Sequence, residues 1–301
     1  MSHEEPLPVP APLRRWVATA TSHRGAASGA PLVHLPDSAT SLVFRAMPDG
    51  VGRWVAVGPR SHASYHHDKD LPLCVRLRLW PGTAGALLGV AAAELVDRVV
   101  PLGELWGRSG DGGCSEGCDG PGGLDGLDGL GGLASSDGLD GAAGSADSGG
   151  RADSSGPRGP VDVVGPEAPA AVVRRVGAVL LARAAALSPA DLARCELVRA
   201  AAATPPGRRE RLPALASRFA VSERHLRALF AEGVGLSPKR TERIARVRGV
   251  LAAPGAARRW AGVAPAAGYY DQSHMTADFR ALMGVPPAAY AAGRLPTLAA
   301  C

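Results

Sequence analysis

The chain has 301 residues, 46% of them hydrophobic, which suffices for two folded domains joined by connecting segments. Its formal net charge of +5 is uneven, because residues 201–301 hold 15 basic and 6 acidic side chains whereas residues 108–168 hold 3 and 11. Such a concentration of positive charge is typical of a segment that binds a polyanion. Five scattered cysteines argue against a disulfide framework, and the lack of a leader or a long apolar run predicts a cytoplasmic chain without membrane segments.

The N-terminal third predicts a short tail followed by a mostly β domain. Residues 1–30 are rich in Pro, Ala and Ser, which favours a disordered tail. Residues 31–107 contain short β-prone runs between Pro, Asp and Gly, and 75–79 alternate strictly, as in a half-buried strand. The other expected strands are 41–45 and 54–57, and a helix of small residues is expected at 83–90.

Residues 108–168 consist largely of Gly, Asp, Ser and Leu and predict an acidic disordered linker. The tandem Gly-Leu-Asp units at 123–133 are similar to calcium-binding repeats but lack their longer period. Cys114 and Cys118 are the only close cysteine pair, and no further zinc ligands lie near them. Two exposed thiols in a loose loop are therefore the favoured interpretation.

Clustered histidines before the middle of the β region raise the question of a metal site. Four neighbouring side chains could ligate a metal, namely His62, His66, His67 and Asp68. A loop with clustered histidines is more often solvated, so the sequence predicts neither a metal nor a cofactor.

The region 169–293 predicts an all-helical domain. Helices are expected at 167–187 and at 189–203, the second packing on the segment that follows. A further helix is expected at 238–251, with apolar residues on one side, namely Ile244, Val247 and Leu251.

One pattern is written twice within this region, at 212–231 and 259–282. Each copy has an apolar–Ala pair, a turn residue, a capping residue, and apolar side chains four and eight positions after the cap. Each is followed by a Gly-x-Ser-Pro or Gly-x-Pro-Pro end that stops one helix and starts another. The spacing predicts two helix-turn-helix units joined by the helix at 238–251.

The stretches SERHLRALFAEGVGLSPK and AGYYDQSHMTADFRALMGVPPAAY resemble the two halves of the AraC/XylS transcription regulators, over residues 190–292. The stretches LPDSATSLVF, RLRLWPGTAGALLGV and ELVDRVVPLGELWG, with VGP at 57–59, resemble a domain found in a subset of AraC-like regulators. The resemblance implies an α+β chain with a mostly β sensor or dimerisation domain at 31–107, a disordered linker, and an all-α double helix-turn-helix domain.

Three positions depart from the family pattern. Ala220 stands where a Gly is usual, which predicts a strained turn. Pro265 lies inside the short helix of the second copy and is expected to shorten or kink it. The segment 38–41 lacks the polar pattern of the family, so the sequence assigns it no ligand role.

The exposed side chains of the second helix in each copy are candidates for reading bases. Arg offers two donors to guanine, Gln can pair with adenine, and the Thr methyl can touch thymine. The resemblance places base contacts on Arg224, Arg227, Ala228, Gln272, Ser273, Thr276 and Ala277. The expected phosphate contacts are Lys239, Arg243, Arg246 and Arg280.

The sequence thus predicts a sequence-specific DNA-binding transcription regulator rather than an enzyme. Double-stranded DNA is the expected partner, and the resemblance adds RNA polymerase, a small-molecule effector and a second copy of the chain as candidates. The alternative is an alkyl-transfer repair enzyme, since AraC-like domains are also fused to such modules. That alternative needs an activated cysteine, and Cys74 lies in a strand pattern without basic or metal-binding company.

Overall fold

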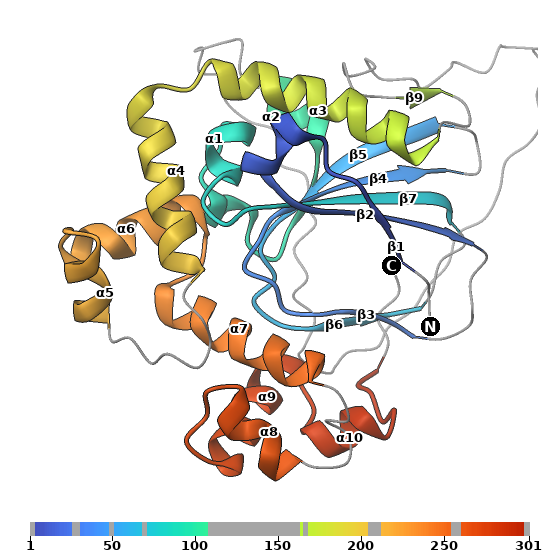
Figure 1. Cartoon of the computed structure of the whole chain (residues 1–301). Helices are drawn as coiled ribbons and strands as arrows, with labels where there is room; N and C mark the ends of the chain where they lie inside the picture. The colour runs from blue at the N-terminus through green and yellow to red at the C-terminus, as the bar shows by residue number, and fades with distance from the viewer. Residues whose placement is uncertain are drawn as a thin grey trace, which may run out of the picture. The chain divides into compact units, whose positions relative to one another are not determined.

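The structure is a computed structural model that describes residues 4–25, 31–47, 51–67, 71–107, 163–164, 168–203, 212–253 and 260–297. Within these residues the N-terminal part is mostly β-sheet and the C-terminal part is helical, as Figure 1 shows. The predicted α+β class is therefore confirmed. Most of the expected linker at 108–168 lies outside the described residues, as do Cys114 and Cys118.

The main sheet is antiparallel and accounts for most of the N-terminal part. Its strand order is β1 (Glu5–Leu7), β2 (Val17–Gly25), β7 (Leu71–Leu79), β4 (Ser41–Ala46), β5 (Val51–Val57) and β8 (Val99–Pro101), and β9 (Val163–Val164) also pairs with β5. Two further strands, β3 (Leu32–His34) and β6 (Ser64–His66), pair with each other and form a separate ribbon. The predicted strands at 41–45, 54–57 and 75–79 are confirmed inside β4, β5 and β7.

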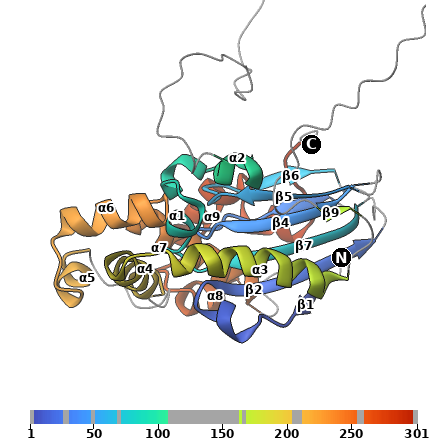
Figure 2. The same ribbon diagram turned by 90° about the horizontal axis from the view of Figure 1, so that it is seen from above.

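One face of the sheet carries the core of this part. Val75 and Leu77 on β7 are fully buried, and the register places Phe44 and Leu42 of β4 beside them. Helix α3 (Pro169–Ala185) lies along this face next to β7, as Figure 2 shows, together with α1 (Ala84–Leu88) and the short η1 helix (Ala11–Arg15). Burial of each large aliphatic side chain contributes about 1.5–3 kcal/mol, which holds α3 on the sheet.

The sequence-based domain boundaries need three corrections. The expected tail at 1–30 contains β1, η1 and β2, and β2 pairs with β7 along most of its length. Helix α3, expected in the helical domain at 169–293, instead packs its valines into the core of the sheet. The linker expected to reach 168 contains β9, which extends the sheet at β5. Pairing with distant strands orders β2 and β9, whose own hydrophobic signal is weak, whereas α3 forms where a helix was expected and differs only in what it packs against.

The helical part has its own core. Its elements are α4 (Pro189–Ala202), α5 (Leu212–Arg218), α6 (Glu223–Gly233), α7 (Pro238–Ala252), α8 (Trp260–Ala266), α9 (Gln272–Met283) and α10 (Pro287–Ala291). Helix α4 packs on α6 and α7 through Val198, which confirms the expected packing of the helix at 189–203. Ile244 and Val247 on α7 are buried between the two repeat units, and Leu251 packs against the same core.

The β3–β6 ribbon contacts the end of α9. The Ala63 amide donates to the Leu282 carbonyl oxygen at 2.8 Å, and Tyr65 Oη donates to the Met283 carbonyl oxygen at 2.6 Å. Two short helices lie elsewhere: η2 (Ala92–Leu95) packs on α6, and α2 (Leu102–Gly107) packs on β5 and β8. Among the described helices, none is both long and apolar enough to cross a membrane.

Candidate nucleic-acid interface

The two repeat units have matching helix starts. Ser222 Oγ accepts a hydrogen bond from the His225 amide at 3.1 Å, and Asp271 Oδ1 accepts one from the His274 amide at 2.7 Å. Each side chain satisfies an amide that the first helical turn leaves without a partner. The caps therefore begin α6 and α9 at equivalent positions. As a result, equivalent positions of the two helices face outward and inward.

The turns before these helices also match. The amide of Val221 donates to the Ala216 carbonyl oxygen at 3.0 Å, and the amide of Tyr269 donates to the Ala264 carbonyl oxygen at 2.9 Å. The turn requires a left-handed residue, which is Gly268 with φ 79° in the second unit but Ala220 with φ 52° in the first. A side chain in this conformation costs about 1–2 kcal/mol, so the strain expected from the sequence is present at Ala220.

Pro265 does not shorten its helix. Helices α5 and α8 each have 7 residues, and α8 ends one residue after Pro265. The proline thus lies in the last turn, where it removes only the hydrogen bond that its own amide would have donated. The expected shortening is wrong because the helix stops there in both units.

Both second helices bury one stripe and expose the other. Leu226 and Phe230 on α6 are at most 1% exposed, as are Met275 and Phe279 on α9. Of the expected base-reading side chains, Thr276 is half-buried and the others are exposed, namely Arg224, Arg227, Ala228, Gln272, Ser273 and Ala277. They lie on the N-terminal half of each helix, which is the part that enters the groove in helix-turn-helix proteins.

Arg227 is held in place on the exposed face of α6. Its Nη2 lies 2.6 Å from Glu223 Oε2, one helical turn earlier, and the Arg227 side chain is 57% exposed. An exposed pair of this spacing contributes only about 0.3–0.5 kcal/mol, so the guanidinium can leave Glu223 at little cost. The pair therefore does not prevent Arg227 from contacting a base or phosphate.

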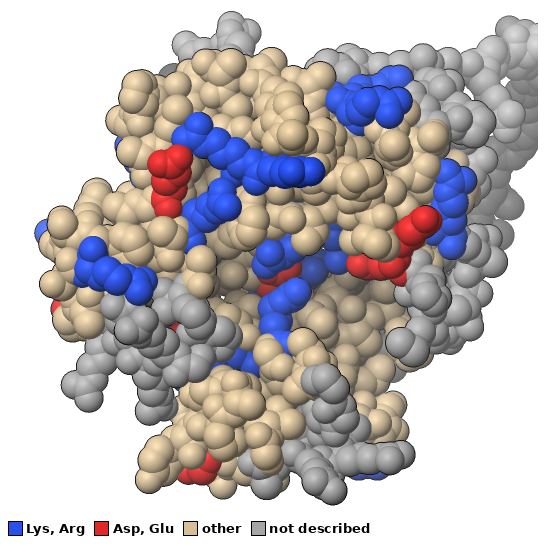
Figure 3. Space-filling view, viewed as in Figure 1, with Lys and Arg blue, Asp and Glu red and all other residues tan. Residues whose placement is uncertain are grey.

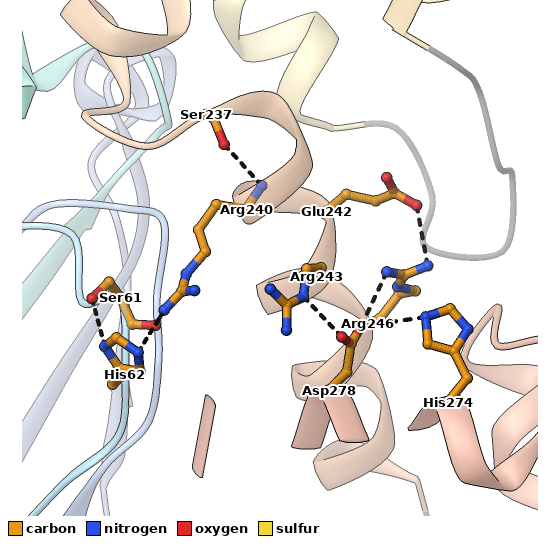
Figure 4. Close-up of polar contacts among 9 residues, drawn as sticks. All are labelled: Ser61, His62, Ser237, Arg240, Glu242, Arg243, Arg246, His274 and Asp278. Carbon is orange, nitrogen blue, oxygen red and sulfur yellow. Dashed lines mark hydrogen bonds and ion pairs between the residues drawn. The ribbon is translucent and has the colours of Figure 1, made fainter. Parts of the chain in front are cut away.

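Helix α9 is anchored on α7 by a buried ion-pair network, drawn in Figure 4. Arg243 Nε lies 2.8 Å from Asp278 Oδ1, and Arg246 Nη2 lies 3.2 Å from Asp278 Oδ2. Asp278 and Arg246 are 6% and 5% exposed, and Glu242 lies 3.4 Å from Arg246 on the other side. The Arg246 guanidinium also stacks over the Tyr269 ring at 4.9 Å. The network fixes α9 relative to α7.

This network changes the assignment of two expected phosphate contacts. Arg246 is buried and paired, so the structure contradicts its expected role at a phosphate. Arg243 points to the same carboxylate with its side chain 25% exposed, so it also belongs to this network. Lys239 and Arg280 are exposed and stay candidates for phosphate contact.

Asp278 is the residue that sequence reasoning missed, and the repeat contained the signal for it. It stands seven positions after the cap Asp271, where the first unit has Leu229, which is 4% exposed. An acidic residue at a position that is buried in the other copy needs a cationic partner. The arginines of α7 supply it.

The linking helix also contacts the N-terminal part. Arg240 Nη2 donates to the Ser61 carbonyl oxygen at 2.7 Å and to His62 Nε2 at 2.9 Å (Figure 4). Burial, followed by the charge of Arg240, lowers the pKa of His62 below its ordinary value, which keeps the accepting nitrogen unprotonated. Further along α7, Arg248 Nη1 lies 3.5 Å from Asp37 Oδ2. These contacts leave the exposed stripes of α6 and α9 uncovered by described residues.

The residues considered for other chemistry do not assemble a reactive centre in the described part of the chain. Cys74 and Cys195 are free thiols, and burial raises the pKa of both, which disfavours the thiolate. No cluster of three potential metal ligands occurs among the described residues. His62 contacts Arg240, and His66 lies in β6 beside His34.

The geometry of the two units defines the class of helix-turn-helix DNA-binding proteins. Residues 215–293 match the family model described as a helix-turn-helix domain, and this domain is of the AraC type. The chain therefore carries an AraC-type DNA-binding domain and is a DNA-binding transcription regulator. The match does not extend to the N-terminal β part. Comparison with curated proteins and comparison with solved structures gave no match.

Proposed function

We propose that the two recognition helices of one chain, α6 and α9, read successive major-groove segments on one side of a DNA duplex. The observation that carries the proposal is the equivalence of the two units, in which matching caps and buried stripes expose equivalent positions. Helix α7 joins the units as a rod of 15 residues, about 22 Å long at 1.5 Å per residue. Major-groove segments on one side of DNA recur about every 34 Å. The length of α7 and the widths of the two units together cover this separation.

The exposed side chains suggest a division of labour between the helices. Arg224 and Arg227 on α6 offer bidentate donors to guanine, whereas Gln272 on α9 suits adenine and Thr276 suits a thymine methyl. Lys239 and Arg280 are exposed, which supports a role for them at phosphates, contacts that fix register without reading sequence. The first unit thus specifies G·C positions and the second A·T positions.

The N-terminal β part serves, in this proposal, as the regulatory domain. Its ribbon contacts the end of α9 and its loop at Ser61 contacts α7, so a change in the β part reaches both units. RNA polymerase and a second copy of the chain are partners that the family resemblance suggests. The alkyl-transfer alternative is not favoured, because burial of Cys74 works against the thiolate that it requires.

The test is binding of variants to a preferred DNA site selected from random sequence, and to scrambled DNA. Arg227→Ala is expected to cost about 1–3 kcal/mol on the selected site and to relax the preference at one G·C position. Gln272→Ala is expected to relax a different position, located in the neighbouring groove segment.

Arg174→Ala, on the exposed side of α3, is the matched control and should leave binding unchanged. Equal weakening on selected and scrambled DNA would make Arg227 a phosphate contact. Relaxation at the same base pair by both variants would refute the assignment of one helix to each segment.

A further inference from the structure

The second face of the main sheet is basic where the first is apolar. On β7, Cys74, Arg76 and Arg78 alternate with the buried aliphatic residues and therefore point to the opposite side. The register places Arg45 of β4 directly beside Cys74, on the same face. Figure 3 shows the surface hollowed between the sheet and the β3–β6 ribbon, with basic side chains in the hollow.

The ribbon presents two histidines to this face. The rings of His34 and His66 lie 5.3 Å apart, on the side of the ribbon opposite to Tyr65. Burial, followed by the charges of Arg60 and Arg76, lowers the pKa of His34 to about 3. Both imidazoles thus stand in a basic environment between the ribbon and the sheet.

Acidic partners for the arginines are few among the described residues. Asp37 is shared, since Arg78 Nη2 lies 2.6 Å from Oδ1 while Arg248 of α7 lies 3.5 Å from Oδ2. The nearest carboxylate to Arg76 is that of Glu4, at 3.6 Å and 54% exposed.

Two further arginines have no ion pair within the described part of the chain. Arg60 Nε donates to the Leu35 carbonyl oxygen at 3.1 Å, and burial, followed by the charge of Arg76, lowers the pKa of Arg60 to about 10. Arg45 forms no ion pair with a carboxylate of the described residues. Asp37 and Asp97 offset part of the positive charge at Arg60. Arg60 and Arg76 still repel each other, and a bound anion would relieve that repulsion.

We propose that the hollow between the sheet and the β3–β6 ribbon binds a small molecule bearing a carboxylate or phosphate group. Arg45 and Arg76 from the sheet and Arg60 from the loop before β6 pair with its oxygens, in the fork geometry that guanidinium groups offer to such anions. The neutral imidazole of His34 donates one further hydrogen bond from the ribbon. The ligand adds a second link between the sheet and the ribbon, beside the Asp37–Arg78 pair, and this site is separate from the DNA-reading helices.

The probes for the test are inorganic phosphate and citrate, added to the full chain at constant ionic strength with sodium chloride as the reference. The Tm is measured by thermal unfolding, and the Kd by calorimetry. One probe is expected to raise the Tm above the chloride reference, because a ligand that binds only the folded state stabilises it. Arg45→Gln and Arg76→Gln are each expected to weaken binding at least about 10-fold.

The control is Arg174→Gln on α3, on the far side of the sheet, which should bind the probe as the parent does. Arg45→Gln decides the case if Arg76→Gln unfolds, because Arg45 has no ion pair with a described residue and its removal relieves repulsion. In probe-free buffer its Tm should equal or exceed that of the parent. A Tm shift that chloride reproduces, failure of both probes to bind, or unchanged affinity in Arg45→Gln would each overturn the proposal.

Discussion

Replacing Asp278 by leucine tests the packing of α9 on α7. The change leaves Arg246, which is 5% exposed, with only Glu242 at 3.4 Å, and it leaves Arg243 with no carboxylate from α9. Breaking a buried ion pair from one side costs about 3–5 kcal/mol. Because Arg243 is partly exposed and Glu242 remains, we expect a loss near the lower limit, about 3 kcal/mol.

Amide hydrogen exchange is the assay, since it reports the stability of α9 separately from that of the sheet. A loss of about 3 kcal/mol corresponds to exchange about 150-fold faster in α9 and α7. The control is Arg280→Gln, an exposed change on the same helix. It should change the free energy of opening that is derived from exchange by less than about 0.5 kcal/mol.

The double variant Asp278→Leu with Arg246→Met should recover part of the loss, because it removes the stranded charge as well. A loss below about 1 kcal/mol in Asp278→Leu, or no recovery in the double variant, would show that the network does not anchor α9.

Three further predictions follow from single features. Ala220→Gly should stabilise the protein by about 0.5–1 kcal/mol in urea unfolding, because Ala220 has φ 52°, and a neutral or destabilising result would contradict the strain. The pKa of His34 is about 3 in the folded protein, below its ordinary 6.5. The contribution of His34 to the free energy of unfolding is therefore fully present above pH 6.5. It decreases as the pH falls from 6.5 towards 3, by up to about 1.4 kcal/mol per pH unit. His34→Gln should flatten this part of the pH profile, and an unchanged slope would count against the assignment. DNA affinity should fall with salt with a slope of about −0.9 per phosphate neutralised, and titrations that show no salt dependence would exclude phosphate contacts as a main source of affinity.

The helix-turn-helix units were predictable from the sequence because their signals are local. Caps, turn residues and the inward stripe all lie within about a dozen residues, and the structure confirms the caps at Ser222 and Asp271. The strands at 5–25 were missed because their order comes from pairing with β7, some 55 residues away, while Val17-Ala18-Thr19-Ala20 offers a weak apolar alternation.

The charged residues were harder to assign than the apolar ones. Arg243 and Arg246 have the spacing of an exposed basic face, and only the fold brings Asp278 against them. The alternation along β7 predicted a half-buried strand, yet not that Arg76 would lie near His34 of a second layer or that Arg78 would pair with Asp37. Which face of a strand is covered by other residues depends on segments distant in sequence, such as the β3–β6 ribbon.

The measurement that tests the central claim most directly is a footprint of the full chain on its selected DNA site, at single-base-pair resolution. The account predicts protection of two major-groove segments on one side of the duplex, centred about 10–10.5 base pairs apart, by a single chain. Arg227→Ala should weaken protection of one segment first, and Gln272→Ala that of the other. Protection of one segment only, or of two segments only when two chains are bound, would contradict the account.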